Sequence, residues 1–185
     1  MGLLGKHQIE NAKTAILLAE ILQDNFKITH ENIIFGLQSA VHKGRLEFYE
    51  KFLFDGAHNA SGARALREFL DEFIKQPITM IFGAMRDKNL AEIAGILFPK
   101  AEKLVFTAVD NVRSMKTEEF LEFLPEDFPR NKVFLAENVS EALKIARKIS
   151  SAKDLICVTG SLYLIGEAQK ILSEGVKKSD FQEKL

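Results

Sequence analysis

The feature that most constrains this chain is an alternation of short apolar runs with longer helical patterns, which extends from Gly44 to Leu172. The apolar runs, which are typical of buried strands, occur at residues 52–54, 78–82, 104–109, 133–135 and 155–158. Helical patterns follow most of them, at residues 63–74, 90–98, 118–124, 140–149 and 162–172. This alternation predicts an α/β fold, with a mostly parallel sheet covered by helices on both faces and joined by right-handed crossovers.

Two smaller signals refine this expectation. Residues 46–49 are expected to add a strand that pairs with the first run as an antiparallel hairpin. Thr117 precedes two glutamates, and a hydroxyl followed by acidic residues is typical of a helix N-terminus, so Thr117 is predicted to be an N-cap.

A pair of helices is expected before the alternating region. Within residues 7–22, apolar side chains recur at helical spacing, at Ile9, Ala12, Ile16, Ala19 and Leu22. A second helix is predicted over residues 30–41, with Thr29 as its N-cap. Residues 42–44 are polar and contain a glycine, so they are predicted to be a domain junction. The chain therefore divides into a helical segment (1–42), an α/β domain (43–176) and a charged tail (177–185).

Composition excludes several classes of protein. Of the 185 residues, 46% are hydrophobic and 15 are Phe, which indicates a globular protein. The net charge of −1 gives no bulk attraction to nucleic acid or to a membrane surface. No apolar stretch approaches the roughly 20 residues of a membrane span. The single cysteine, Cys157, lies in an apolar run, which indicates a buried thiol in a reducing, cytoplasmic setting.

Polar side chains follow the first apolar run at the point where it is predicted to end. Asp55, Gly56, His58 and Asn59 stand between this run and the next helical pattern, and Arg45 precedes the run. The carboxyl ends of parallel strands form the ligand-binding edge of an α/β sheet. An acid, an imidazole, an amide and a guanidinium at that edge suit a nucleotide together with a small zwitterion. The plainer alternatives are a surface arginine at a domain junction and turn residues that cap a helix.

Two other strand ends carry polar groups. Asp87 and Lys88 follow the run at 78–82 and form either a charged loop facing a ligand cleft or a solvated ion pair. Ser161 and Tyr163 follow the run at 155–158, where a helix N-terminus offers free N–H groups to a carboxylate. Ser161 could equally serve only to cap that helix.

Three segments together resemble a known family. Arg45 with Asp55-Gly56-Ala57-His58-Asn59 resembles the C-terminal domain of folylpolyglutamate synthase/dihydrofolate synthase, in the Mur ligase superfamily. The segment from Gly5 to Ala12, Gly-Lys-His-Gln-Ile-Glu-Asn-Ala, is similar to a G-x-H-Q-x-x-N-A stretch near the end of that family's central ATPase domain. The segment from Thr159 to Gly166 resembles its last strand-to-helix turn. The resemblance implies a Rossmann-like domain preceded by two helices left from the ATPase domain.

The resemblance also implies roles for individual residues. Asn11, Arg45 and Asp55 would contact ATP. His58 and Ser161 would position L-glutamate for catalysis, with Asn59 and Tyr163 beside them, and Asp87 and Lys88 would rank second. No metal ligand is expected in this chain, because the family's magnesium ligands belong to its N-terminal part.

The reaction implied is an ATP-dependent, ADP-forming ligation of L-glutamate through an acyl phosphate, which extends tetrahydrofolate to polyglutamates, converts dihydropteroate to dihydrofolate, or does both. No G-x-x-x-x-G-K-[ST] motif occurs in the chain, so the chain is expected to need an N-terminal ATPase portion and to fold without catalysing. Two alternatives remain: the C-terminal domain of a peptidoglycan-precursor Mur ligase, and a non-catalytic module that binds a nucleotide or an amino acid. A dinucleotide-binding domain is disfavoured, because no G-x-G-x-x-G follows the first run.

Overall fold

The structure, a computed structural model, describes residues 2–182, with side chains described as far as residue 174. The first part of the chain forms α1 (His7–Leu22), α2 (His30–Ser39), β1 (Glu47–Tyr49), β2 (Phe52–Asp55), α3 (Ala60–Phe73) and β3 (Ile78–Phe82). The second part forms α4 (Leu90–Leu97), β4 (Lys103–Thr107), β5 (Val133–Ala136), α5 (Val139–Ile149), β6 (Leu155–Thr159) and α6 (Leu162–Gln182). Short 3₁₀ helices lie at η1 (Phe98–Lys100), η2 (Thr117–Phe123) and η3 (Arg130–Lys132).

The strands form a six-stranded sheet in the order β1-β2-β6-β3-β4-β5. β1 pairs with β2 in antiparallel register, whereas the other neighbouring strands are parallel. The mostly parallel sheet and the antiparallel hairpin strand predicted from the sequence are therefore confirmed.

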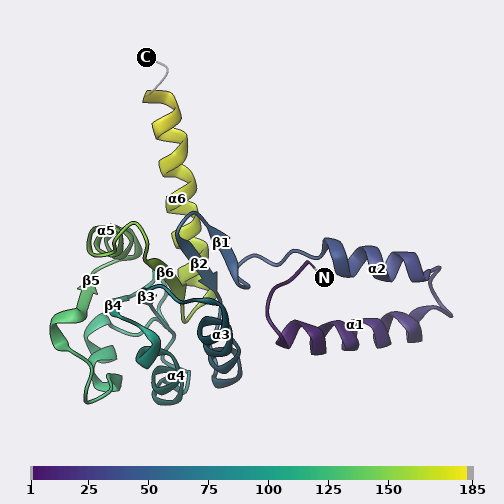
Figure 1. The fold of residues 1–185 in the computed structure, drawn as a ribbon, viewed down its shortest axis with the longest axis horizontal. Coiled ribbons are helices and arrows are strands. Elements are labelled where there is room, and N and C mark those ends of the chain that lie inside the picture. The colour runs from purple at the N-terminus through teal and green to yellow at the C-terminus, as the bar shows by residue number, and fades with distance from the viewer. Residues whose placement is uncertain (1, 183–185) are drawn as a thin grey trace.

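Helices cover both faces of the sheet (Figure 1). Side chains alternate along β2, so that Leu53 joins the core beneath α3 and α4, while Phe52 and Phe54 join the core beneath α5 and α6. A group of phenylalanines fills the first core, in which the rings of Phe82 and Phe106 both pack against Phe98 and Phe120. Cys157 is fully buried in this core, and burial raises the pKa of its thiol.

The helix at residues 118–124 differs from the expectation. It is the 3₁₀ helix η2, and it ends at Phe123 because Leu124, the residue before Pro125, has extended backbone dihedrals. The prediction that Thr117 is the N-cap is wrong, since Lys116 holds that position. The buried Thr117 hydroxyl instead donates to the carbonyl oxygen of Ala136 at 3.3 Å, which ties the 3₁₀ helix to the end of β5.

Three other helix boundaries differ from the expectation by two residues or more. α3 begins three residues earlier than predicted, because Asn59 caps it. α2 ends at Ser39 and not at residue 41. α6 continues to Gln182, into the segment predicted as a charged tail, and residues 183–185 lie outside the described residues.

Helices α1 and α2 form an arm that projects from the α/β domain (Figure 1). Thr29 caps α2 as predicted, in a capping box with Asn32. Two apolar side chains of α1, Leu17 and Ile21, lie outside the predicted stripe. They are 57% and 62% exposed. In the described part of the chain, no helix combines the length and the apolar character needed to cross a membrane.

Candidate functional site

The carboxyl ends of three neighbouring strands meet at one edge of the sheet. Asp55, the last residue of β2, pairs with Thr159 of β6, and Phe82 of β3 also pairs with Thr159. The next residue after β3, Gly83, donates its N–H to the Thr159 carbonyl oxygen at 3.3 Å. The ends of the three apolar runs that the sequence analysis selected, at residues 52–54, 78–82 and 155–158, therefore lie at one edge of the sheet, as predicted.

A hollow of about 250 Å³ opens at this edge, between the start of α1 and the start of α3. We call it the strand-end hollow. It is lined by His7, Asn11, Arg45, Asp55, Gly56, Ala57, His58, Asn59, Ser61, Gly62, Ala65 and Leu66. The structure therefore brings together five of the residues selected from the sequence, although they come from separate segments of the chain.

Asp55 is buried at the base of the hollow, with 3% of its surface exposed. One carboxylate oxygen accepts the N–H of Leu46 at 3.0 Å, and the other accepts the N–H of Ala57 at 3.0 Å. Burial raises the pKa of the Asp55 carboxyl, although the two N–H donors and the positive charge of Arg45 act in the opposite direction. Asp55 thus holds two loops together, and each of its oxygens retains a lone pair for a ligand.

Arg45 is half-buried on a turn between the arm and the sheet. The following residue, Leu46, has a φ of 46°, a left-handed backbone conformation that residues other than glycine rarely adopt. Within the described residues, the Arg45 guanidinium has no hydrogen-bond acceptor and no ion-pair partner. An uncommitted guanidinium beside a hollow is suited to a phosphate or carboxylate group, because its N–H groups match two oxygens at once.

The start of α1 contributes an amide cluster. The buried Gln8 lies 3.0 Å from the Nε2 of His7 and accepts the Nδ2 of Asn11 at 2.9 Å. Three residues of the segment from Gly5 to Ala12 that resembles the family thus form one cluster in the structure. Since Asn11 uses its nitrogen on Gln8, its Oδ1 is left to accept a hydrogen bond from a ligand.

His58 and Asn59 lie at the turn into α3. The Nδ1 of His58 is 2.8 Å from the Gly56 carbonyl oxygen, which can only accept, so Nδ1 carries the proton and Nε2 is an acceptor. Asn59 accepts the Gly62 N–H through its side-chain oxygen at 2.8 Å and caps α3. Asn59 therefore has a clear structural role, whereas the Nε2 atom of His58 is available to a ligand.

Ser161 and Tyr163 do not line the strand-end hollow. Ser161 is buried, and its hydroxyl oxygen accepts the Tyr163 N–H at 3.1 Å, which is a helix-capping contact. The intervening Leu162 packs against Gly56. A Cβ added to Gly56 would lie 2.4 Å from the Cδ2 atom of Leu162. Tyr163 is 55% exposed.

Asp87 and Lys88 also lie apart from the hollow. Their side chains form an exposed ion pair of 2.9 Å, and its hydrogen bond lowers the pKa of Asp87. Lys88 lines a second hollow with Arg86 and Glu119, between α4 and η2. Within the described residues, no group of three or more His, Cys, Asp and Glu side chains is arranged to hold a metal ion.

Sequence reasoning missed Glu47 and Gln169. Glu47 Oε2 accepts the Gly44 N–H at 2.7 Å and the Gln169 side-chain nitrogen at 2.9 Å. The contact with Gln169 joins residues 122 positions apart, so no local pattern indicates it. The one sequence feature that could have indicated a role for Glu47 is its position two residues after Arg45.

Comparison with known proteins assigns the family. The sequence profile described as "Dihydrofolate synthetase, C-terminal domain" matches residues 38–171. The chain is 32% identical, over 177 residues, to a "Probable bifunctional folylpolyglutamate synthase/dihydropteroate synthase" of Haloferax volcanii, and the match covers 94% of this chain and 21% of that protein. It is 30% identical to the "Dihydrofolate synthase/folylpolyglutamate synthase" of Bacillus subtilis, covering 92% of this chain and 40% of that protein.

A solved structure shares the fold. The Mycobacterium tuberculosis folylpolyglutamate synthase complexed with ADP superposes with a TM-score of 0.78 at 24% identity, over 91% of this chain and 40% of that one. The chain thus spans less than half the length of these relatives. Because the sequence profile of the family matches residues 38–171, which are most of the chain, this chain belongs to the family of dihydrofolate synthetase C-terminal domains.

Proposed function

We propose that this chain is the C-terminal part of an ATP-dependent ligase that adds L-glutamate to a folate, either as dihydrofolate synthase, as folylpolyglutamate synthase or as both. The observation that carries this proposal is the strand-end hollow, where an uncommitted guanidinium, a buried carboxylate and two free acceptors converge in a domain of this family. We place the reaction in the cytoplasm, where ATP is available.

The nucleotide side of the proposal uses three residues. Arg45 binds phosphate oxygens, Asp55 accepts a ribose hydroxyl through a remaining lone pair, and Asn11 Oδ1 accepts the exocyclic amine of adenine. Bound ADP in the Mycobacterium tuberculosis relative supports a nucleotide as ligand. ATP is expected to bind with Mg²⁺. As the family resemblance implies, the ligands of that ion are expected from an N-terminal ATPase portion.

The glutamate side of the proposal uses His58, with Asn59, Ser161 and Tyr163 nearby on the same edge. A solved structure described as a bifunctional folylpolyglutamate synthase/dihydrofolate synthase with Mn, AMPPNP and L-glutamate bound supports an amino acid as second ligand. His58 Nε2 can accept from the glutamate ammonium group, and the N-terminus of α6 at Ser161 suits a carboxylate. Asp87 and Lys88 remain second in rank, because they lie at a different hollow.

The proposed chemistry has two steps. A folate carboxylate oxygen takes the γ-phosphoryl group of ATP, which gives an acyl phosphate and ADP. The glutamate nitrogen then attacks the acyl carbon, an amide bond forms, and phosphate leaves as the nitrogen loses a proton. This chain's part is to orient both ligands, since phosphoryl transfer depends mainly on positioning and electrostatic stabilisation.

A non-catalytic binding module is the second candidate. This alternative is kept because the chain contains no G-x-x-x-x-G-K-[ST] motif to bind the phosphates of ATP. A chimera separates the two: the matched 40% of the Bacillus subtilis synthase is replaced by this chain. The proposal expects phosphate release that requires both a folate and L-glutamate, and expects Arg45→Ala, but not the exposed Arg113→Ala, to slow it. A folded chimera that binds ADP but releases no glutamate-dependent phosphate would favour the binding module.

A further inference from the structure

We propose that Glu47 is a positioning residue, which holds the turn that presents Arg45 to the strand-end hollow and, through Gln169, connects that turn to α6. This inference rests on the proposed nucleotide contact of Arg45. It deepens that proposal by naming a residue outside the hollow on which Arg45 depends.

The backbone around Arg45 is fixed by hydrogen bonds on both sides. Before it, the Gly44 N–H donates to Glu47 Oε2 at 2.7 Å, and the Gly44 carbonyl oxygen accepts the Gly56 N–H at 2.7 Å. After it, the Leu46 N–H donates to Asp55. A carboxylate therefore accepts the backbone N–H of the residue on each side of Arg45, and one of the two carboxylates comes from a residue that does not line the hollow.

The turn needs such support because its backbone is unusual. Gly44 and Leu46 have φ angles of 70° and 46°, so Arg45 stands between two residues in left-handed conformations. The left-handed conformation carries no steric cost for Gly44, but it is costly for Leu46 and persists there only where surrounding contacts enforce it. A side-chain oxygen is suited to this task, because it accepts the Gly44 N–H, which would otherwise lose its hydrogen-bond partner.

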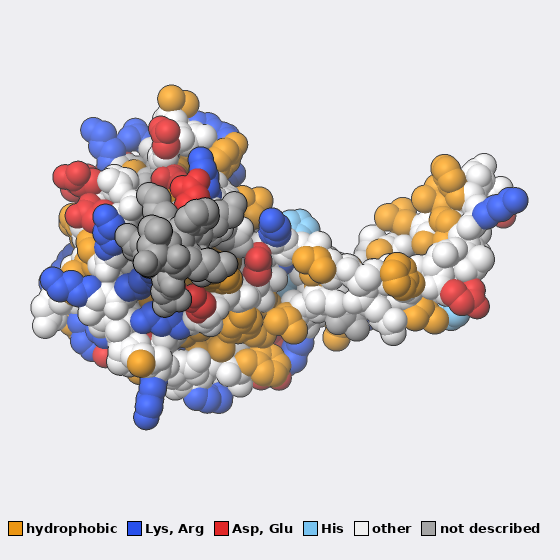
Figure 2. Space-filling view, turned by 90° about the horizontal axis from the view of Figure 1, so that it is seen from above, with side chains coloured by type: hydrophobic (Ala, Val, Ile, Leu, Met, Phe, Trp, Pro, Cys, Tyr) orange, Lys and Arg blue, Asp and Glu red, His pale blue; other side chains and the backbone are white. Residues whose placement is uncertain are grey.

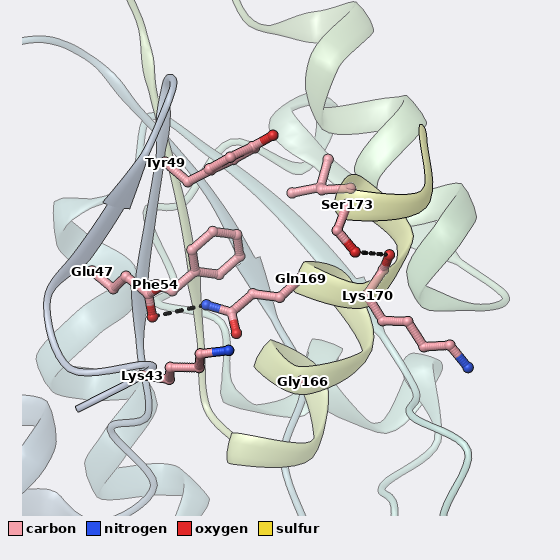
Figure 3. A pocket seen from close by; sticks show the side chains of 9 residues that line it. Lys43, Glu47, Tyr49, Phe54, Gly166, Gln169, Lys170 and Ser173 are labelled. Atoms are coloured by element: carbon pink, nitrogen blue, oxygen red, sulfur yellow. Dashed lines mark hydrogen bonds between the residues drawn. The ribbon is translucent and has the colours of Figure 1, made fainter. Parts of the chain in front are cut away.

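Gln169 extends this support to another element. Figure 3 shows the Gln169 side chain reaching from α6 across a groove to Glu47, while Lys43 lies below it and the side chain of Lys170 leads away. The contact is 2.9 Å long, and both residues line this groove of about 430 Å³. α6 also contacts the turn directly, since a Cβ on Gly44 would lie 3.2 Å from the Cγ2 of Ile165. The turn is thus held against α6 at two points.

The groove between Glu47 and Gln169 is not proposed as a ligand-binding site. Its aromatic base, Phe54, is fully buried, and the Lys170 ammonium does not face into it. The polar contact that crosses the groove therefore indicates a structural connection to Arg45.

A double-mutant cycle tests the inference on the full chain. ADP is titrated against the chain, Glu47→Ala, Arg45→Ala and the double variant, and binding is followed by amide chemical shifts. Glu47→Ala is expected to weaken ADP binding about threefold to tenfold, and to have no further effect in the Arg45→Ala background, because it acts through Arg45. Glu47→Gln keeps an oxygen acceptor for the Gly44 N–H and is expected to restore most of the affinity.

The matched control is Glu50→Ala, which removes a carboxylate from the same hairpin. Glu50 forms an exposed ion pair of 3.7 Å with Arg147, away from the turn, so its loss is expected to leave ADP binding unchanged. Gln169→Ala removes only the connection to α6 and is expected to give a smaller effect than Glu47→Ala.

The outcomes separate this inference from the proposed function. If Glu47→Ala weakens binding equally with and without Arg45, or if Glu47→Gln fails to restore it, the positioning role is overturned. If Arg45→Ala itself leaves ADP binding unchanged, the nucleotide assignment fails. Amide hydrogen exchange then still tests the turn: faster exchange at Gly44 and Leu46 in Glu47→Ala supports the positioning of this turn, and unchanged exchange refutes it.

Discussion

The α/β domain and the arm formed by α1 and α2 differ in how far their apolar side chains are buried. In the domain, the largest side chains of both sheet faces are fully buried, among them Phe54, Phe82 and Phe106. In the arm, Phe35 and Leu17 are 70% and 57% exposed, and Figure 2 shows hydrophobic side chains along its surface. Both regions have clear helical signals, so the difference lies in tertiary packing.

The comparison teaches what local signals can and cannot do. The capping box of Thr29 and Asn32 defines where α2 begins without any help from the α/β domain. Helix stability in water, however, depends mostly on the burial of an apolar face, and isolated helices shorter than about 12–15 residues are marginal. We therefore expect the domain to be stable through its own core and the arm to be the first part to open.

The largest expected effect follows directly. Phe106→Ala should lower the free energy of unfolding of the domain by about 3–5 kcal/mol, because it leaves a cavity among packed rings. Phe35→Ala, which removes the same atoms from an exposed position in the arm, should change it by less than about 0.5 kcal/mol. Urea unfolding monitored by far-UV circular dichroism measures both. Equal losses would show that the arm is part of the cooperative core.

A smaller effect is expected at the place where the two regions meet. Arg45→Ala should weaken ADP binding by about 2 kcal/mol, or roughly thirtyfold, because one charge-assisted contact is lost. Asn11→Ala, on the arm side of the same hollow, should weaken it less, since a neutral hydrogen bond contributes about 1 kcal/mol. Amide shifts during an ADP titration measure both, with Arg113→Ala as control. A change below threefold for Arg45→Ala would show that this residue is structural.

An effect on the order of 1 kcal/mol is expected at the opposite end of the sheet from the hollow. Hydrogen bonds from Ser151 lower the pKa of Asp154, whereas burial raises the pKa of Asp55. Asp154 therefore stabilises the fold above its unfolded pKa of about 3.9, and this contribution is lost as the pH falls through the lower folded value. For Asp55 the sign is reversed, so its contribution is present below about pH 3.9 and is lost as the pH rises through the higher folded value.

Carbon-detected NMR titration checks this pair of carboxyl groups within one domain. The Asp55 carboxyl should titrate above its ordinary range and the Asp154 carboxyl below it. Asp154→Ala should cost about 1 kcal/mol near neutral pH and much less in acid, where the wild-type carboxylate is protonated. The same loss at both pH values would assign the effect of Asp154 to packing.

Much of the fold could be predicted because five of the six strands, all except β1, are short apolar runs that end in a turn. The bounds of α1 and β3 agree with the sequence pattern, and most other elements agree within a few residues. The errors occur where tertiary contacts override local signals. Thr117 has the chemistry of an N-cap, but its hydroxyl is taken by Ala136, which no local pattern indicates.

The candidate site could be predicted only in part. Arg45, Asp55 and His58 were found because they flank a recognisable strand end, and the fold brings them to one hollow. Ser161 follows a strand at the same edge, but its side chain does not reach that hollow and instead accepts the Tyr163 N–H. A sequence pattern can assign a residue to an edge of the sheet, but it does not give the direction of the side chain. Glu47 was missed for a related reason, since its role depends on a contact with distant Gln169.

The smallest effect is expected at the ion pairs that hold the arm against the domain. Lys6, just before α1, contacts Glu72 at 2.7 Å and Glu68 at 3.4 Å, both on α3. These groups are exposed, so their interaction is screened by salt and should add little to the stability of the domain. The preceding Gly5 has a φ of 98°, and an added Cβ there would lie 2.9 Å from Leu46 Cδ1, so this turn is packed against the Arg45 turn.

Lys6→Ala should therefore leave the unfolding midpoint unchanged and yet speed proteolytic cleavage between residues 2 and 6. Raising the salt concentration should have the same effect on the wild-type chain and none on the variant. If cleavage of the variant is not faster, the ion pairs do not restrain the arm, and packing at the Gly5 turn is sufficient to hold it.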